Sequence, residues 1–299
     1  MKPFTAARRH ELVEFARQAG FGDVCFDDDA FLQLVDILIA LPSVCVAYSG
    51  GVDSTFLLSV ASSLLGERVL GVLAESESLD QSEHEAALAL ARDHALRVRV
   101  IETHEYENPA YRKNDAQRCF HCKTELFTRV AQLAADEGFQ VVADGSNADD
   151  VGDFRPGLRA RDAHGVRSPL LEAGLKKGAI RTLSQALGLP TWDKPAAPCL
   201  ASRIPYGSPV THEKLRQVEA AEKALRELGF RELRVRHHGP VARLELPVAE
   251  FGRLLDPALQ AAVLSGVKAA GFLFVALDLE GFRSGSLNRA LSEANPGAS

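Results

Sequence analysis

The strongest constraint on the fold of this chain is a short glycine loop between an apolar run and a helix. Residues 44–48 are apolar and β-prone, as expected of a strand buried on both faces. Ser-Gly-Gly-Val-Asp-Ser follows at 49–54, and a helix is expected over 55–65. Two glycines let the backbone turn sharply and approach a ligand closely, and the N–H groups at a helix start bind anions. The pattern predicts a phosphate-binding loop. The alternative is a glycine turn in which Asp53 or Ser54 only caps the helix.

Strands and helices alternate along the chain up to a proline-rich break near 194–209. Further strands are expected at 69–74, 98–101 and 140–143, and further helices at 31–41, 82–95, 124–137 and 179–187. Beyond the break, we expect helices at 211–228 and 248–255 and strands at 233–236, 242–246 and 272–277. The first part predicts an α/β fold around a parallel sheet in residues 1–197, and the second predicts a smaller α+β domain in residues 198–299.

Composition argues against several classes of partner. The 299 residues carry a formal net charge of −6, so a basic face for nucleic acid is not expected, although a local basic patch remains an alternative. No apolar run approaches the ~20 residues that span a membrane. Residues 1–20 are charged and helical in pattern, without the apolar core of a signal peptide. We therefore expect a cytoplasmic protein that binds a small molecule, with neither a nucleic acid nor a membrane as its partner.

The glycine loop resembles that of one nucleotide-binding family. It is not a Walker A loop, because no Gly-Lys-Ser/Thr follows, and it is not a Rossmann fingerprint. It resembles the loop of the PP-loop ATP pyrophosphatases, which include NAD and GMP synthetases, asparagine synthetases and tRNA thiolases. The resemblance implies that ATP is cleaved between its α and β phosphates to give an adenylated substrate and pyrophosphate, with Asp53 as a catalytic residue. The implied ATP-binding residues are Ser49, Gly50, Gly51, Asp53, Ser54 and Thr55.

Two later segments fit the same family. Asp-Gly-Ser-Asn-Ala-Asp-Asp at 144–150 follows the fourth expected strand, so it belongs at the carboxyl edge of the sheet, where α/β folds bind ligands. Carboxylates there suit Mg²⁺, and Asp144 and Asp149 are the candidates. The alternative is a solvated acidic loop. Residues 174–181 resemble the family's lysine-bearing helix start, with Ala179 in place of the usual acidic residue.

The five cysteines are of two kinds. Cys45 lies inside the first expected strand and Cys25 has no partner pattern, so both are expected to be small core residues. Cys119, Cys122 and Cys199 are expected in loops, where nearby cations favour a thiolate. Those cations are Arg118, Lys123 and Arg203. A disulfide framework is not expected in a reducing compartment.

The segments around these three cysteines narrow the resemblance to the LarE-type sulfur transferases. Over nearly the whole chain, the matching segments are the glycine loop, R-C-F-H-C-K at 118–123, D-G-S-N-A-D-D at 144–150, P-C-L-A-S-R-I-P-Y-G at 198–207, R-V-R at 234–236 and G-F-R-S-G-S-L-N at 281–288. Members of this family act on a pyridinium dicarboxylate mononucleotide to build the nickel-pincer nucleotide cofactor of lactate racemase. The resemblance also implies a homo-oligomer.

The resemblance implies a sulfur-transfer role for Cys199. Its thiolate attacks a ring carboxylate that ATP has adenylated, and AMP leaves. Either a cysteine gives up its own sulfur and becomes dehydroalanine, or Cys119, Cys122 and Cys199 hold a 4Fe-4S cluster that carries an additional sulfide. Two alternatives remain open for the three cysteines: a zinc site completed by a histidine such as His121, and free thiols. For Cys199 alone, a small buried thiol is a further alternative.

Two arginines form a candidate site for the phosphate of the substrate. Arg234 and Arg236 lie two apart in an expected strand, so both side chains project to the same face. Neighbouring guanidinium groups suit a phosphate, and the resemblance assigns them that role. The alternative is an exposed strand face of solvated arginines. Further candidates for the same site are Ser202, Arg203, Glu222 and Glu245.

Two other classes of function remain open. One is a different PP-loop adenylating enzyme: a tRNA thiolase, which the net charge argues against, or an amide-forming synthetase, although no glutaminase domain fits in this length. The other is a non-catalytic nucleotide-binding regulator, which the intact Asp53, Asp149 and Asp150 argue against.

Overall fold

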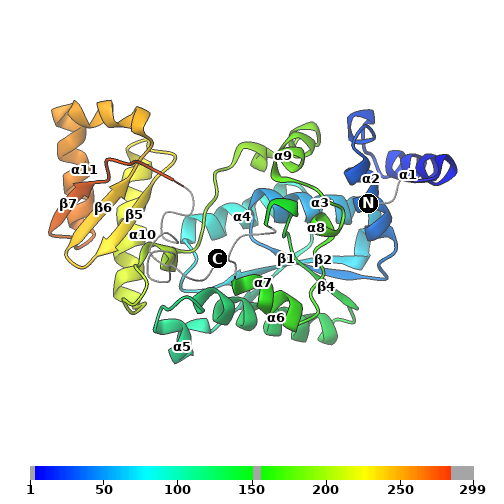
Figure 1. Ribbon diagram of the computed structural model, residues 1–299, viewed down its shortest axis with the longest axis horizontal. Helices are drawn as coiled ribbons and strands as arrows, with labels where there is room; N and C mark the ends of the chain where they lie inside the picture. Colours follow the sequence, from blue (N-terminus) through cyan, green and yellow to red (C-terminus); the bar gives the residue numbers. More distant parts are fainter. Residues whose placement is uncertain (1–3, 151–155, 284–299) are drawn as a thin grey trace, which may run out of the picture. The chain divides into compact units, whose positions relative to one another are not determined.

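In the computed structural model, which describes residues 4–150 and 156–283, the four apolar runs before the proline-rich break pair as one parallel sheet (Figure 1). The strands are β1 (Val44–Tyr48), β2 (Val69–Glu75), β3 (Val98–Glu102) and β4 (Val141–Ala143), in the order β3-β2-β1-β4. β1 has the predicted boundaries, and each other strand differs from its prediction by one residue at one end. The predicted α/β fold with a parallel sheet is confirmed.

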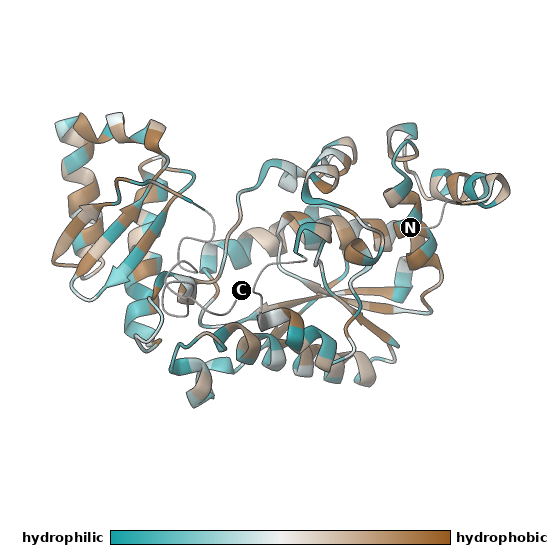
Figure 2. Ribbon diagram, in the orientation of Figure 1, coloured by the Kyte–Doolittle hydropathy of each residue, from teal (hydrophilic) through white to brown (hydrophobic). Residues whose placement is uncertain are grey.

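Helices cover both faces of this sheet. The helices of this part of the chain are α1 (Ala6–Gln18), α2 (Asp29–Ile39), α3 (Val52–Leu65), α4 (Gln81–Asp93), α6 (Arg118–Asp136), α7 (Pro156–Ala163), the short α8 (Pro169–Glu172) and α9 (Lys177–Ala186). α3 and α4 lie on one side of the sheet, and α6 and α7 lie on the other (Figure 1). Val44 and Val46 pack in the core that contains α2 and α3, whereas Cys45 packs with Val130 of α6. Strands covered on both faces are apolar throughout, and β1, β2 and β4 are mainly hydrophobic in Figure 2.

The strand order creates a switch point beside β1. β1 pairs with β2 on one side and with β4 on the other, both in parallel. The loops that follow β1 and β4 therefore leave the same carboxyl edge of the sheet from adjacent strands. Ligands of α/β proteins bind at such a point.

The chain divides into two compact units. Unit 1 comprises residues 1–76, 81–105 and 119–197, and unit 2 comprises residues 77–80, 106–118 and 198–299. The predicted boundary between residues 197 and 198 is where the chain passes for the last time from unit 1 to unit 2. Unit 2 also contains two earlier segments that the sequence analysis did not assign to it.

A three-stranded sheet in the order β5-β6-β7 lies at the centre of unit 2. The helices and strands of unit 2 are α5 (Pro109–Arg112), α10 (His212–Glu227), β5 (Arg234–His238), β6 (Val241–Glu245), α11 (Pro257–Ala269) and β7 (Phe274–Leu277). β5 and β6 are antiparallel, β6 and β7 are parallel, and α10 and α11 pack together. The predicted smaller α+β domain is confirmed.

Several local predictions were wrong. α3 begins at Val52 and α6 at Arg118, each earlier than predicted. Val248–Leu255 is a 3₁₀ helix, and α11 was not predicted. The motif residues 284–288 and the tail 295–299, for which fraying was predicted, lie outside the described residues. Within the described ranges, no helix is long and apolar enough to cross a membrane.

Candidate functional site

The glycine loop after β1 is packed against α4. Gly50 has a φ of 66°, and a β-carbon built on it would lie 2.5 Å from Cβ of Ala87. Glycine is the residue that meets both conditions without strain. Gly51 is the N-cap of α3 and has no side chain to occupy the first N–H groups of the helix, which lack intrahelical partners. The start of α3 is therefore open to an anion.

Two serines hold the loop together. The backbone N–H of Ser49 donates to Oγ of Ser54 at 3.1 Å, and the two hydroxyl oxygens lie 3.0 Å apart. Ser54 is 5% exposed, and Thr55 is wholly buried. The residues predicted to bind ATP thus lie together around the start of α3, although the side chain of Thr55 is not exposed.

Gly145 brings the loop after β4 against the same helix start. A β-carbon built on Gly145 would lie 3.0 Å from the backbone nitrogen of Ser54 and 3.2 Å from its Cα. Such a contact is tighter than side chains normally make, so the close approach depends on glycine. The two loops that were predicted from separate segments are therefore in contact at the carboxyl edge of the sheet.

The two candidate carboxylates of the second loop both have protein partners. Asp144 is 7% exposed and accepts hydrogen bonds from the N–H of Ser146, the hydroxyl of Ser146 and the hydroxyl of Ser168, at 3.1, 2.8 and 2.6 Å. Oδ2 of Asp149 accepts from the backbone N–H of Lys177 at 2.8 Å. A solvated acidic loop does not describe Asp144, and Mg²⁺ binding by these two residues stays a prediction.

Lys177 links the helix start of α9 to the glycine loop. Its Nζ donates to Oδ2 of Asp53 at 2.5 Å. Oδ1 of Asp53 is buried and has no hydrogen-bond partner among the residues that the structure describes. A carboxylate oxygen that can still accept a ligand, and that lies beside a helix start, suits a divalent cation that accompanies a phosphate.

Two of the three candidate sulfur ligands lie on a helix. Cys119 and Cys122 are three residues apart at the start of α6, so they share one face, and both are partly buried. The prediction that they lie in a loop was wrong, because α6 begins at Arg118. They belong to unit 1 and Cys199 belongs to unit 2, so joint ligation of a cluster stays a prediction. Over the described ranges, no group of three or more His, Cys, Asp or Glu side chains is arranged to hold a metal ion.

Cys25 and Cys45 are core residues, as predicted. Both are wholly buried thiols. Burial raises the pKa of Cys25 to about 11 and that of Cys45 to about 12. Both thiols are uncharged at neutral pH and are therefore poor nucleophiles.

The turn that follows Cys199 is fixed within unit 2. Cys199 is partly buried and is the N-cap of a short 3₁₀ helix, Leu200–Arg203. Arg118, which is 2% exposed, donates to the carbonyl oxygen of Ala201 at 2.8 Å. The residue that precedes Cys119 is thus hydrogen-bonded to the turn after Cys199, a contact that no sequence pattern predicted.

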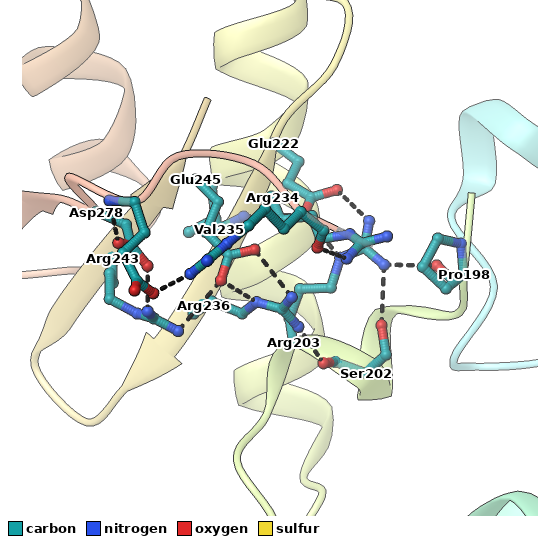
Figure 3. A network of polar contacts seen from close by, with 12 residues as sticks. Pro198, Ser202, Arg203, Glu222, Arg234, Val235, Arg236, Arg243, Glu245 and Asp278 are labelled. Carbon is teal, nitrogen blue, oxygen red and sulfur yellow. Dashed lines mark hydrogen bonds and ion pairs between the residues drawn. The ribbon is translucent and has the colours of Figure 1, made fainter. Parts of the chain in front are cut away.

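Buried ion pairs organise the arginines of unit 2 (Figure 3). Arg203 donates to both carboxylate oxygens of Glu222 at 2.8 and 3.0 Å, and Arg236 donates to both oxygens of Glu245 at 2.9 Å. These four side chains are at most 4% exposed, which excludes the alternative of solvated arginines. Ser202 joins the two pairs, because its hydroxyl accepts from Arg203 and its carbonyl oxygen accepts from Arg236.

Arg234 differs from its neighbours because no carboxylate pairs with it among the described residues. It is 5% exposed, its Cζ lies 4.7 Å from the ring centroid of Phe282, and its Nη1 donates to the carbonyl oxygen of Arg283 at 3.2 Å. Burial, followed by the charges of Arg236 and Arg203, lowers the pKa of Arg234 to about 10. A buried guanidinium that no carboxylate of the described residues pairs with is a candidate site for an anionic ligand.

Comparison with known proteins assigns the family. No protein-family model matches the chain. The pyridinium-3,5-bisthiocarboxylic acid mononucleotide synthase of Lactiplantibacillus plantarum is 40% identical over 262 residues, which cover 87% of this chain and 94% of that protein. The chain belongs to this family, the LarE-type sulfur transferases. An uncharacterized protein of a Synechocystis strain is 44% identical over 83% of this chain and 92% of its own length. An uncharacterized protein of Methanocaldococcus jannaschii is 27% identical over 81% of this chain and 91% of its own length.

In this LarE-type chain, the residues predicted for ATP and those predicted for the substrate phosphate form one group each, in different units. The loop residues and Asp149 lie around the start of α3 in unit 1, and Ser202 with the three arginines lies in unit 2. Two lysines that contact the glycine loop were not among the predicted site residues. Lys177 lies in the segment 174–181. This segment resembles the lysine-bearing helix start of the PP-loop family, and that resemblance is a signal from which Lys177 could have been predicted. Lys194 contacts the carbonyl oxygen of Gly50, and no sequence pattern singled it out.

Proposed function

We propose that this chain is an ATP-dependent sulfur transferase of nickel-pincer nucleotide biosynthesis. It adenylates a carboxylate of pyridinium-3,5-biscarboxylic acid mononucleotide and converts that carboxylate to a thiocarboxylate. The observation that carries the proposal is the 40% identity to a synthase named for the bisthiocarboxylic acid product. The match covers 87% of this chain and 94% of that synthase. No observation favours the alternative of a tRNA thiolase or an amide-forming synthetase.

Unit 1 is the proposed site of ATP and Mg²⁺. The open start of α3 and the backbone of Gly51 suit the β and γ phosphates, which leave together as pyrophosphate. Asp53 is the proposed catalytic residue. Its Oδ1 has no hydrogen-bond partner within ranges 4–150 and 156–283, and it suits a cation that neutralises charge developing on the leaving group. Lys177 holds the other oxygen of the same carboxylate and so fixes its orientation.

Unit 2 is the proposed site of the phosphate on the mononucleotide substrate. Arg203 and Arg236 are each neutralised by a buried glutamate, so Arg234 supplies the positive charge that is not already paired within the described residues. A phosphate on Arg234 would compensate a charge that burial disfavours. Ser202, Arg203 and Arg236 then act as neighbours that shape the site.

Cys199 is the proposed nucleophile. Its Sγ bonds to the acyl carbon of the adenylated carboxylate, the bond from that carbon to the AMP oxygen breaks, and AMP leaves with the electron pair. If the cysteine is sacrificed, a base removes the Cα proton and the Cβ–Sγ bond breaks, which leaves the sulfur on the product and dehydroalanine at position 199. If Cys119, Cys122 and Cys199 hold a 4Fe-4S cluster, the iron without a protein ligand would supply a sulfide instead.

We place this reaction in the cytoplasm, where thiols stay reduced, and the family resemblance implies that the enzyme is a homo-oligomer. The test is to incubate the protein, purified without oxygen, with the dicarboxylate mononucleotide, ATP and Mg²⁺. Chromatography is expected to show AMP and pyrophosphate, and mass spectrometry is expected to show an oxygen of the substrate replaced by sulfur. Stoichiometric ADP, or a product without sulfur, contradicts the proposal.

Two additions to this experiment separate the remaining possibilities. Parallel incubations with tRNA or with ammonia test the alternative enzymes, because AMP formation that depends on either would favour that alternative. The iron content and the absorption spectrum of the anaerobic protein distinguish a 4Fe-4S cluster from zinc and from free thiols.

A further inference from the structure

Lys194 is held close to the glycine loop by its own segment of chain. It follows a short 3₁₀ helix, Pro190–Asp193, and its backbone N–H donates to the carbonyl oxygen of Thr191 at 3.0 Å. Its carbonyl oxygen accepts from Nη2 of Arg181 on α9 at 2.8 Å. These bonds lie within unit 1 and fix the point from which the lysine side chain extends.

The ammonium of Lys194 joins the loop to α4. Nζ lies 3.0 Å from the carbonyl oxygen of Gly50 and 2.7 Å from Oε2 of Glu83. The side chains of Lys194 and Glu83 are 22% and 24% exposed, so the pair is largely shielded from water. Glu83 lies one helical turn before Ala87, the residue against which Gly50 is packed. The same face of α4 therefore supports the loop by contact and by charge.

The position of the Gly50 carbonyl determines where the next N–H points. The described peptide bonds are trans, so the carbonyl of Gly50 and the N–H of Gly51 point in opposite directions. A carbonyl directed at Lys194 directs the N–H of Gly51 away from the lysine and leaves it available at the start of α3. The peptide between two glycines has little steric resistance to flipping, so it needs an external contact to keep one orientation.

We propose that Lys194 is a positioning residue of the phosphate loop, which holds the Gly50 carbonyl so that the Gly51 N–H is available to the pyrophosphate part of ATP. The inference rests on the proposed ATP-binding function. Glu83 contributes to the same positioning, because it holds the ammonium of Lys194 near the Gly50 carbonyl and neutralises the charge of that ammonium. A competing role is direct contact of Lys194 with a phosphate.

The first test compares Lys194→Met with the wild type by calorimetric titration of ATP, pyrophosphate and AMP. We expect the affinities for ATP and pyrophosphate to fall about tenfold, while the affinity for AMP and the melting temperature stay unchanged. Lys194→Arg, which keeps a cation that can reach the carbonyl, is expected to recover part of the loss. The control is Lys223→Met, the same substitution at an exposed lysine on α10.

Glu83→Gln separates the positioning role from direct contact, because the two roles predict opposite signs. If Glu83 holds Lys194 on the loop, Glu83→Gln weakens ATP and pyrophosphate binding. If Lys194 contacts phosphate itself, the loss of the competing carboxylate strengthens that binding, and this outcome overturns the proposal. Unchanged affinity in Lys194→Met overturns it as well. A wild-type protein that binds neither ATP nor pyrophosphate refutes the proposed function together with this inference, so the two failures are distinguishable.

Discussion

Gly50 lies so close to Ala87 that a β-carbon on Gly50 would be 2.5 Å from Cβ of the alanine. Gly50 also has a positive φ, so two separate conditions require glycine at this position. The contact fixes the glycine loop on the face of α4. The position of Gly50 within unit 1 is therefore fixed, which suits a site that must present N–H groups to a phosphate.

Gly50→Ala is expected to destabilise the protein by about 2–4 kcal/mol, from left-handed strain plus overpacking against Ala87. Gly138→Ala is the matched control, since Gly138 also has a positive φ but no described atom lies within 4 Å of its built β-carbon. The control is expected to cost about 1 kcal/mol, and urea unfolding measures both. The double variant Gly50→Ala/Ala87→Gly should recover the overpacking part. Equal losses in Gly50→Ala and Gly138→Ala would show that the contact with Ala87 does not matter.

Arg234→Met is expected to leave the free energy of unfolding unchanged or to raise it. The lowered pKa of Arg234 means that its charged form costs stability at every pH below about 10, and methionine removes that cost. The same substitution should raise the KM for the mononucleotide at least about tenfold, because the proposed phosphate ligand is lost.

Arg236→Met is the contrasting variant in the same strand. It removes the arginine that donates to both carboxylate oxygens of the wholly buried Glu245, so we expect a loss of about 3 kcal/mol in urea unfolding. Two variants that destabilise the protein equally would contradict the view that Arg234 differs from Arg236 in lacking a carboxylate partner among the described residues.

Cys25 and Cys45 are expected to resist alkylation in the folded protein. At pH 8, iodoacetamide should modify the partly buried Cys119, Cys122 and Cys199 of the metal-free protein, as measured by peptide mass spectrometry. Urea should make all five cysteines react. Rapid labelling of Cys25 or Cys45 without urea would contradict their assignment to the core.

The pKa values of these two thiols also predict alkaline destabilisation. Both are raised above the ordinary value of 9.0, so the folded state favours the thiol form, and this stability is fully present below pH 9. It is lost as the pH rises from about 9 toward the folded-state values of about 11 and 12. Thermal unfolding across this range should show the decline, and Cys25→Ala should make the decline shallower. A melting temperature that is constant from pH 8 to pH 11 would contradict the raised pKa values.

Cys199→Ala, prepared and reconstituted without oxygen, tests the proposed nucleophile. It should still bind ATP and form the adenylated substrate with pyrophosphate, because the glycine loop is in unit 1, but it should transfer no sulfur. If the three cysteines hold a cluster, Cys119→Ala and Cys199→Ala should both lose iron, while Cys25→Ala and Cys45→Ala keep it. Wild-type sulfur transfer by Cys199→Ala would remove the central residue of the proposal.

Local patterns in the sequence were sufficient for most of the sheet and for the glycine loop. β1 and its loop were predicted because an apolar β-prone run and a Gly-Gly turn are encoded by adjacent residues. α11 was missed because its segment is rich in small residues and buries only Val263 and Val267. Its helix depends on close packing with α10, where a β-carbon on Gly266 would lie 2.8 Å from Cβ of Ala224.

The sequence alone determined which residue types were available for the site: a glycine loop, an acidic loop, three cysteines and two arginines in one strand. Only the tertiary structure decided their states. Arg234 and Arg236 are equivalent in sequence, yet Arg236 meets the carboxylate of Glu245 on the neighbouring strand while Arg234 stacks on Phe282. Lys177 and Lys194 reach the glycine loop across 124 and 144 residues of chain. Sequence periodicity shows which residues share a face of one helix or strand. A charge, by contrast, is paired or unpaired according to what folds against it from elsewhere in the chain.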